Sequence, residues 1–157
     1  MTTRFLWLSV AVVLILLTPT RIDAQAKLLV GTWRLVSAED RLSGGKIEYP
    51  FGERAIGTIT YDSTGHMAVQ IMRRTRTKWA AFEDGAAEPL LSYIAYFGTY
   101  DVDEKTHKVT HHIEGHLDPK RIGVDNVRTY ELVGQRLTLI EAERPERHVT
   151  WERVRSR

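Results

Sequence analysis

From residue 32 onward, apolar and polar residues alternate in short runs that are rich in Val, Ile, Thr and Tyr and are separated by turn residues. A period of two is typical of a β-strand with one buried face. Turns at residues 62–65 and 134–135 predict hairpins between their flanking runs. The pattern predicts eight strands, or nine with the short run at 46–49. The expected strands are residues 32–37, 46–49, 56–61, 66–72, 96–102, 107–114, 125–133, 136–142 and 148–155.

The helical signal is confined to one stretch, residues 86–93, where Pro89 suits a first helical turn. The preceding segment, residues 73–84, is too polar for a core strand, and we interpret it as a loop or lid. Short strands at regular spacing without alternating helices are typical of a sandwich or a barrel. An eight-stranded antiparallel barrel is just wide enough to hold one small ligand.

The first 26 residues differ from the rest of the chain. Arg4 precedes an apolar run of 13 residues, 5–17, and Ala24-Gln25-Ala26 forms a small-x-small cleavage site. This order is typical of a secretory signal peptide, and the run is shorter than the roughly 20 residues of a membrane-spanning helix. We expect a signal peptide at 1–26 and an exported domain at 27–157, periplasmic or secreted. The alternative is an uncleaved anchor, the only membrane association that we expect.

Composition excludes several classes of function. The 157 residues are 43% hydrophobic, which fits one globular domain, and the net charge of +2 gives no electrostatic argument for nucleic acid. Cysteine is absent, so disulfides, thiolate metal sites and cysteine nucleophiles are excluded. No Gly-rich phosphate-binding motif is present. We expect no cofactor, and composition does not predict the oligomeric state.

Residues near the two ends of the expected exported domain resemble those of a known family. Gly31-Thr32-Trp33 at the first strand resembles the Gly-x-Trp signature of lipocalins, in which an Arg of the last strand packs across the Trp; here that Arg is Arg153. Over residues 28–155 the chain resembles the bacterial and fungal lipocalin-like domain family. The matching segments are 59–62, 65–67, 96–100, 109–114, 123–125, 127–128 and 136–139. The resemblance implies an all-β, eight- to nine-stranded antiparallel up-and-down barrel with one short helix, which binds a small hydrophobic molecule.

Arg128-Thr129-Tyr130 is the first candidate binding motif. Residues two apart on a strand point the same way, and a guanidinium with a nearby phenol can hold a carboxylate. The pair resembles the Arg-x-Tyr of fatty-acid-binding barrels. We therefore expect a small hydrophobic ligand, with a carboxylate as its candidate polar end. The expected ligand-binding residues are Arg128, Tyr130, Tyr96, Tyr100, His66 and Met72.

His112 and Glu114 form the candidate catalytic pair, since they share a strand face and could exchange a proton. They support the alternative of a small isomerase or cyclase. On a strand His112 and His116 lie about 13 Å apart, too far to share one ion, so we expect no metal site. A filled structural barrel for protein interaction is a third alternative. Alternation leaves open whether the face with His112 or the face with Val109, His111 and Ile113 lies inside.

Overall fold

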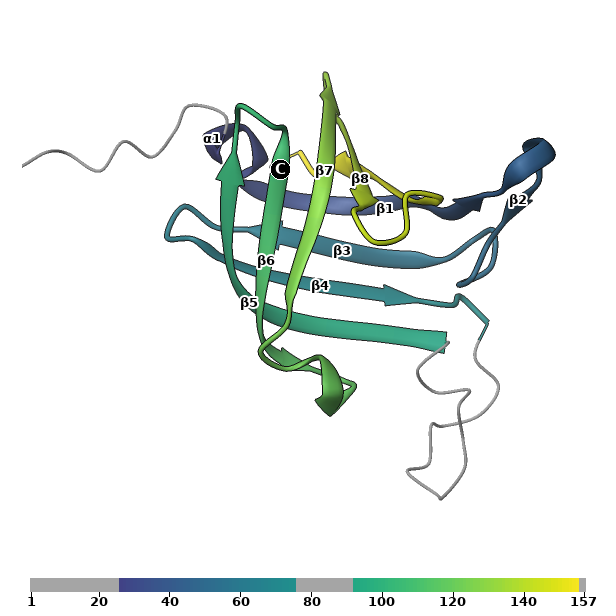
Figure 1. The fold of residues 1–157 in the computed structure, drawn as a ribbon, viewed down its shortest axis with the longest axis horizontal. Coiled ribbons are helices and arrows are strands. Elements are labelled where there is room, and N and C mark those ends of the chain that lie inside the picture. Colours follow the sequence, from purple (N-terminus) through teal and green to yellow (C-terminus); the bar gives the residue numbers. More distant parts are fainter. Residues whose placement is uncertain (1–25, 76–91, 156–157) are drawn as a thin grey trace, which may run out of the picture.

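The chain forms one antiparallel sheet that closes on itself. The computed structural model describes residues 26–75 and 92–155 and is drawn in Figure 1. The strand order is β2-β1-β3-β4-β5-β6-β7-β8-β9, and β1 also pairs with β9. The strands are β1 (Gly31–Arg41), β2 (Ile47–Glu48), β3 (Ile56–Tyr61), β4 (His66–Met72), β5 (Tyr93–Asp103), β6 (Lys108–His116), β7 (Asp125–Val133), β8 (Arg136–Glu141) and β9 (Arg147–Arg153). Eight strands make the closed barrel and β2 extends β1, which confirms the predicted all-β barrel.

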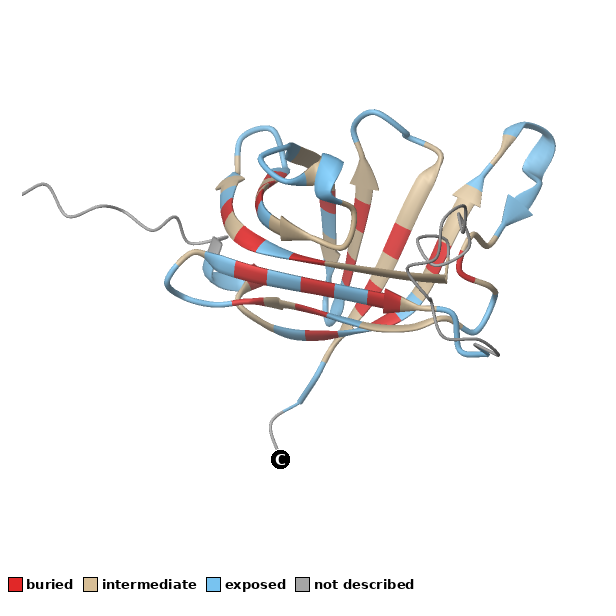
Figure 2. Ribbon diagram, turned by 90° about the horizontal axis from the view of Figure 1, so that it is seen from below, coloured by how far each residue is buried: buried red, intermediate tan, exposed pale blue. Residues whose placement is uncertain are grey.

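The core follows from the period of two along each strand. In β4, Met67, Val69 and Ile71 are buried, and the residues between them face solvent. The same alternation appears as buried bands along the strands in Figure 2. Burial of these apolar side chains, at about 25 cal/mol per Å² of apolar surface, is the main stabilising contribution in a barrel without disulfides.

Two bulges adjust the closure. In β1 the register with β9 shifts between Leu35 and Ser37, and β5 shifts against β6 between Phe97 and Gly98. A Cβ on Gly98 would lie 1.9 Å from the carbonyl oxygen of His112, so a side chain cannot be accommodated there. Beyond this second bulge, His116 lies opposite Tyr96 and their rings stack. The bulge therefore changes which residues of β6 face the interior.

The short helix α1 (Ala26–Leu29) lies at one end of the barrel, beside the start of β1 in Figure 1. The indole Nε1 of Trp33 donates to the carbonyl of Leu29 at 2.9 Å. The guanidinium carbon of Arg153 lies 4.0 Å from the Trp33 ring centroid, which confirms the expected stacking. Arg153 also donates to the carbonyls of Val30 and Leu28. Its donors are thus used by backbone rather than by a carboxylate.

Some predicted segments fall outside the described residues. The signal peptide at 1–26 lies almost wholly in residues 1–25, and most of the predicted loop at 73–84 and helix at 86–93 lies in 76–91. Tyr93, placed in that helix by the sequence, instead begins β5 because it pairs with Met72. No helix in residues 26–75 or 92–155 is long and apolar enough to cross a membrane.

Candidate functional site

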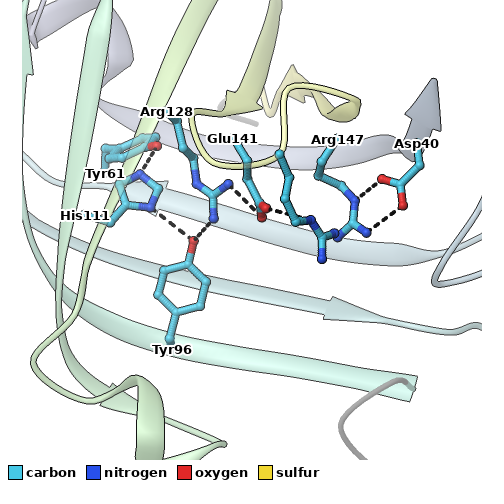
Figure 3. A network of polar contacts seen from close by, with 8 residues as sticks. Asp40, Tyr61, Tyr96, His111, Arg128, Glu141 and Arg147 are labelled. Atoms are coloured by element: carbon cyan, nitrogen blue, oxygen red, sulfur yellow. Dashed lines mark hydrogen bonds and ion pairs between the residues drawn. The ribbon is translucent and has the colours of Figure 1, made fainter. Parts of the chain in front are cut away.

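The barrel interior contains a cluster of four polar side chains on inward faces of four strands. Tyr61 comes from β3, Tyr96 from β5, His111 from β6 and Arg128 from β7. We call these residues the inner polar cluster. In Figure 3 they form a continuous series of hydrogen bonds that leads toward Glu141. All four occupy positions at which alternation buries the side chain, so the strands themselves hold them in place.

His111 is the centre of the cluster. It is 0% exposed, and its Nε2 lies 2.7 Å from the Tyr61 hydroxyl while its Nδ1 lies 3.1 Å from the Tyr96 hydroxyl. Burial, and then the nearby Arg128 charge, holds the pKa of His111 well below its usual value. Burial likewise raises the pKa of Tyr61 well above its usual value. Both groups are therefore neutral at physiological pH.

With His111 and Tyr61 neutral, the inner polar cluster has one more hydrogen-bond donor than its own hydrogen bonds use. A neutral imidazole has one nitrogen that donates and one that accepts. Its two bonds to Tyr61 and Tyr96 thus use the ring proton and one hydroxyl proton. Arg128 donates to the Tyr96 hydroxyl from Nη2 at 3.3 Å. A guanidinium has no acceptor atom, so Arg128 cannot accept a hydroxyl proton from the cluster. One hydroxyl proton is therefore not used in the hydrogen bonds within the inner polar cluster, and the cluster can donate it to a bound molecule.

Arg128 carries the charge of the cluster. It is 7% exposed, and its Nη1 lies 3.2 Å from Glu141, the residue directly opposite it in the pairing of β7 with β8. Burial opposes the charge, but Tyr96 and Glu141 together hold the pKa of Arg128 above its usual value. The guanidinium is therefore permanently charged in a space that excludes most water.

Two further ion pairs continue the series toward the end of the barrel opposite α1. Glu141 meets Arg144 at 3.4 Å, and Asp40 receives two hydrogen bonds from Arg147, one of them 2.8 Å long. The hydrogen bond from Arg147 lowers the pKa of Asp40, so this carboxylate is ionised. Three guanidinium groups thus share two carboxylates, with one positive charge in excess.

The structure brings together only part of the sequence-predicted binding set. Tyr96 contacts Arg128, as Figure 3 shows. Tyr100 is buried nearby, with its ring 4.8 Å from that of Tyr61, but its hydroxyl donates to the carbonyl of Asp62. Tyr130 is buried against His107, and burial and the acidic turn after β5 raise its pKa. The phenol beside Arg128 is therefore Tyr96 rather than Tyr130.

His112 and Glu114, the predicted catalytic pair, lie on the outer face of β6. His112 Nδ1 lies 2.7 Å from Asp125 and its Nε2 lies 3.0 Å from Asp101. These hydrogen bonds, that to Asp125 first, raise the pKa of His112. Alternation is the reason for the placement: with Ile113 and its inward neighbours buried, the residues between them must face out. The pair does not share the interior with Arg128.

The other two predicted residues also lie outside the cluster. His66 is exposed beside the turn after β3, where its Nδ1 lies 2.9 Å from the Thr64 hydroxyl. Met72 is half-buried and lines an outer groove with Arg34, Thr58 and Gln70. Within the described ranges, no three His, Asp or Glu side chains come together as metal ligands.

Sequence reasoning missed His111, Tyr61, Glu141, Asp40 and Arg147. One signal could have identified the first of them. His111 is the single histidine of the chain with Val or Ile at both positions two residues away, Val109 and Ile113. That pattern predicts an inward imidazole, which needs polar partners from other strands. The ion pairs of Arg128 with Glu141 and of Asp40 with Arg147 depend on strand register, and no local pattern predicts them.

Comparison with known proteins agrees with the barrel. The model of the lipocalin-like domain family matches residues 30–154, and the chain therefore belongs to that family. Its fold is similar to a crystal structure of a DUF4847 family protein from Bacteroides vulgatus ATCC 8482. The two are 10% identical with a TM-score of 0.45, over 82% of this chain and 96% of the other. No curated protein matches the sequence.

Proposed function

We propose that this lipocalin-like barrel binds a small hydrophobic molecule in its interior and holds an anionic end of that molecule, such as a carboxylate, at Arg128. The observation that carries the proposal is a permanently charged guanidinium, 7% exposed, on the inward face of the sheet. An isolated buried charge is costly, and proteins keep one where it has a partner or a task. Glu141 is the partner of Arg128, with its Oε1 3.2 Å from Nη1.

The surroundings of Arg128 favour an anion over a neutral polar group. The inner polar cluster has one hydroxyl proton to donate, and the three arginines exceed the two carboxylates by one charge. A carboxylate accepts hydrogen bonds only, and it can accept two from one guanidinium. A neutral alcohol would leave the excess charge unpaired. A carboxylate or a similar anion can accept the unused hydroxyl proton and can also balance the extra guanidinium charge.

The remaining inward side chains suit an apolar body. Met67, Val69, Ile71 and Val149 are buried on strands that surround the cluster. Interior sites for small molecules combine such apolar walls with a few polar groups that fix the orientation. A hydrophobic acid has this division between an apolar body and one anionic end.

A titration with a fluorescent acid tests the proposal. The full-length protein, purified without detergent, is titrated with dansyl-labelled undecanoic acid and with its methyl ester. Arg128→Met should weaken binding of the acid by about tenfold or more, since a charged hydrogen bond contributes about 1.5–3 kcal/mol, and should leave the ester unaffected. Arg34→Met is the matched control, because Arg34 pairs with Glu152 on the outer face. Equal affinities of the Arg128 and Arg34 variants for the acid would reject the anchor. Uptake of neither probe would indicate a filled barrel.

We also propose that the protein is exported and that residues 1–26 are removed. The support is the order of Arg4, the apolar run and Ala24-Gln25-Ala26. Cleavage after Ala26 would keep Leu28 and Leu29, whose carbonyls hold Arg153 and Trp33. N-terminal sequencing of protein recovered from an exporting bacterial host should begin at Lys27. A first residue of Met1 would contradict cleavage.

A further inference from the structure

The two carboxylates at the end of the barrel opposite α1, Asp40 and Glu141, are held in different geometries. Asp40 places both oxygens on one guanidinium, that of Arg147, and one of these contacts is 2.8 Å long. Glu141 places its oxygens on two different guanidiniums, Arg128 at 3.2 Å and Arg144 at 3.4 Å. Charge-assisted hydrogen bonds are usually about 2.7–2.9 Å long, and the paired arrangement is the stronger one. Glu141 is therefore held less firmly than Asp40.

Side-chain exposure increases from Arg128 through Glu141 to Arg144, and Glu141 connects the two arginines. The side chain of Arg128 is 8% exposed, that of Glu141 24% and that of Arg144 47%. Figure 3 shows Glu141 beside Arg128, on the side toward Arg147. One partner of Glu141 thus belongs to the interior and the other lies in the turn between β8 and β9. Glu141 can lose the inner contact and keep the outer one.

We propose that Glu141 is an internal competitor for the anionic end of the ligand and sets the preference of the barrel for acids. Without ligand, its carboxylate neutralises Arg128. When a ligand carboxylate binds Arg128 and Tyr96, Glu141 gives up Arg128 and remains on Arg144. This inference rests on the proposed function, since it requires an anion at Arg128. Its physical basis is that two carboxylates on one guanidinium repel each other in a space with little screening.

The first test neutralises the competitor. Glu141→Gln keeps the shape of the side chain and removes its charge, so dansyl-labelled undecanoic acid should bind about tenfold more tightly than to the unmodified protein. Binding of its methyl ester should be unchanged. Glu152→Gln is the matched control, because it removes one carboxylate from an Arg–Glu pair on the outer face. An unchanged or weaker affinity of Glu141→Gln for the acid would overturn the inference.

The second test removes the outer partner. Arg144→Gln leaves Glu141 with Arg128 alone, so acid binding should weaken, and the same change in the Glu141→Gln protein should have little effect. An equal effect in both backgrounds would show that Arg144 acts only by its charge, and it would overturn the role of Glu141. Arg144 is half-exposed in a turn, so the single variant Arg144→Gln can be measured even if Glu141→Gln fails to fold, and unchanged acid binding by that variant would then overturn the role of Glu141.

The two proposals fail in different ways. If Arg128→Met weakens acid binding but Glu141→Gln does not strengthen it, the anchor holds and the competitor is rejected. If no protein variant takes up either probe, the proposed function fails and the inference fails with it.

Discussion

The inner and outer faces of β6 place two adjacent histidines in opposite environments. His111 is 0% exposed between two tyrosine hydroxyls, and burial lowers its pKa. His112 faces out between Asp125 and Asp101, and these carboxylates raise its pKa. One step along a strand therefore separates a neutral hydrogen-bonding group from one that readily carries charge.

The difference shows how the barrel divides its chemistry. On the outer face water solvates each charge, so an ion pair there contributes little and constrains little. On the inner face each polar group needs a partner, so a donor or charge in excess stands out. The inner polar cluster has both, while His112 is paired on both nitrogens. A bound anion would therefore find an available charge and donor at Arg128 and its neighbours, and not at His112 and Glu114 on the outer face.

The largest expected difference between the two faces of β6 is in the stability lost when each histidine is replaced by alanine. His111→Ala should lower the free energy of unfolding by about 3–5 kcal/mol, since it leaves a cavity and two buried hydroxyls without their partner. His112→Ala should cost less than about 1 kcal/mol, because its partners are exposed and can bind water. Urea denaturation of both variants at neutral pH measures this. Similar costs would mean that the two faces of β6 are not energetically distinct.

Removal of a single hydroxyl from the inner polar cluster should have a smaller effect on stability. Tyr61→Phe keeps the ring and removes the hydroxyl 2.7 Å from His111, so it should lower the free energy of unfolding by about 1–2 kcal/mol. Tyr100→Phe is the matched control, since its hydroxyl bonds the carbonyl of the exposed Asp62, which can bind water instead. It should cost less than Tyr61→Phe in the same denaturation experiment. The reverse order would argue against the inner polar cluster as a stabilising unit.

The sequence predicted the strands better than it predicted the site. The bounds of β3, β4 and β7 agree with the expected 56–61, 66–72 and 125–133, since turn residues border each regular alternation. Alternation also placed Arg128 and Tyr130 on one face, and both are buried.

The contacts within the candidate site could not be predicted from the sequence, for two physical reasons. His111 shares a strand face with Val109 and Ile113, but alternation left open which face of the strand is inside, and nothing in the sequence indicates the partners of His111. The contact of Arg128 with Glu141 depends on the register of β7 and β8, and Asp40 meets Arg147 across 107 positions only because β1 closes on β9. Strand pairing, rather than any local pattern, decides these contacts.

The smallest expected effect is the pH dependence of the outer histidine. The folded pKa of His112 is raised above its unfolded value of about 6.5, so its contribution is fully present below that pH. It is lost as pH rises through the folded pKa. Because the side chain is 36% exposed, the contribution should be below about 1 kcal/mol. The stability difference between the unmodified protein and His112→Gln should therefore be greatest below about pH 6.5 and decrease as the pH rises through the folded pKa of His112.

The difference between the two proteins isolates His112 from its neighbour. The folded pKa of His111 is lowered, so below about pH 6.5 the unfolded chain binds a proton that the folded chain does not, and stability falls on acidification. This slope arises from protonation of the unfolded chain, which both proteins share, so it largely cancels in the difference. Asp125→Asn removes the first cause of the raised His112 pKa and should reduce the pH dependence of the difference in the same denaturation series. A difference that stays constant with pH would mean that His112 is held no more tightly when charged than when neutral.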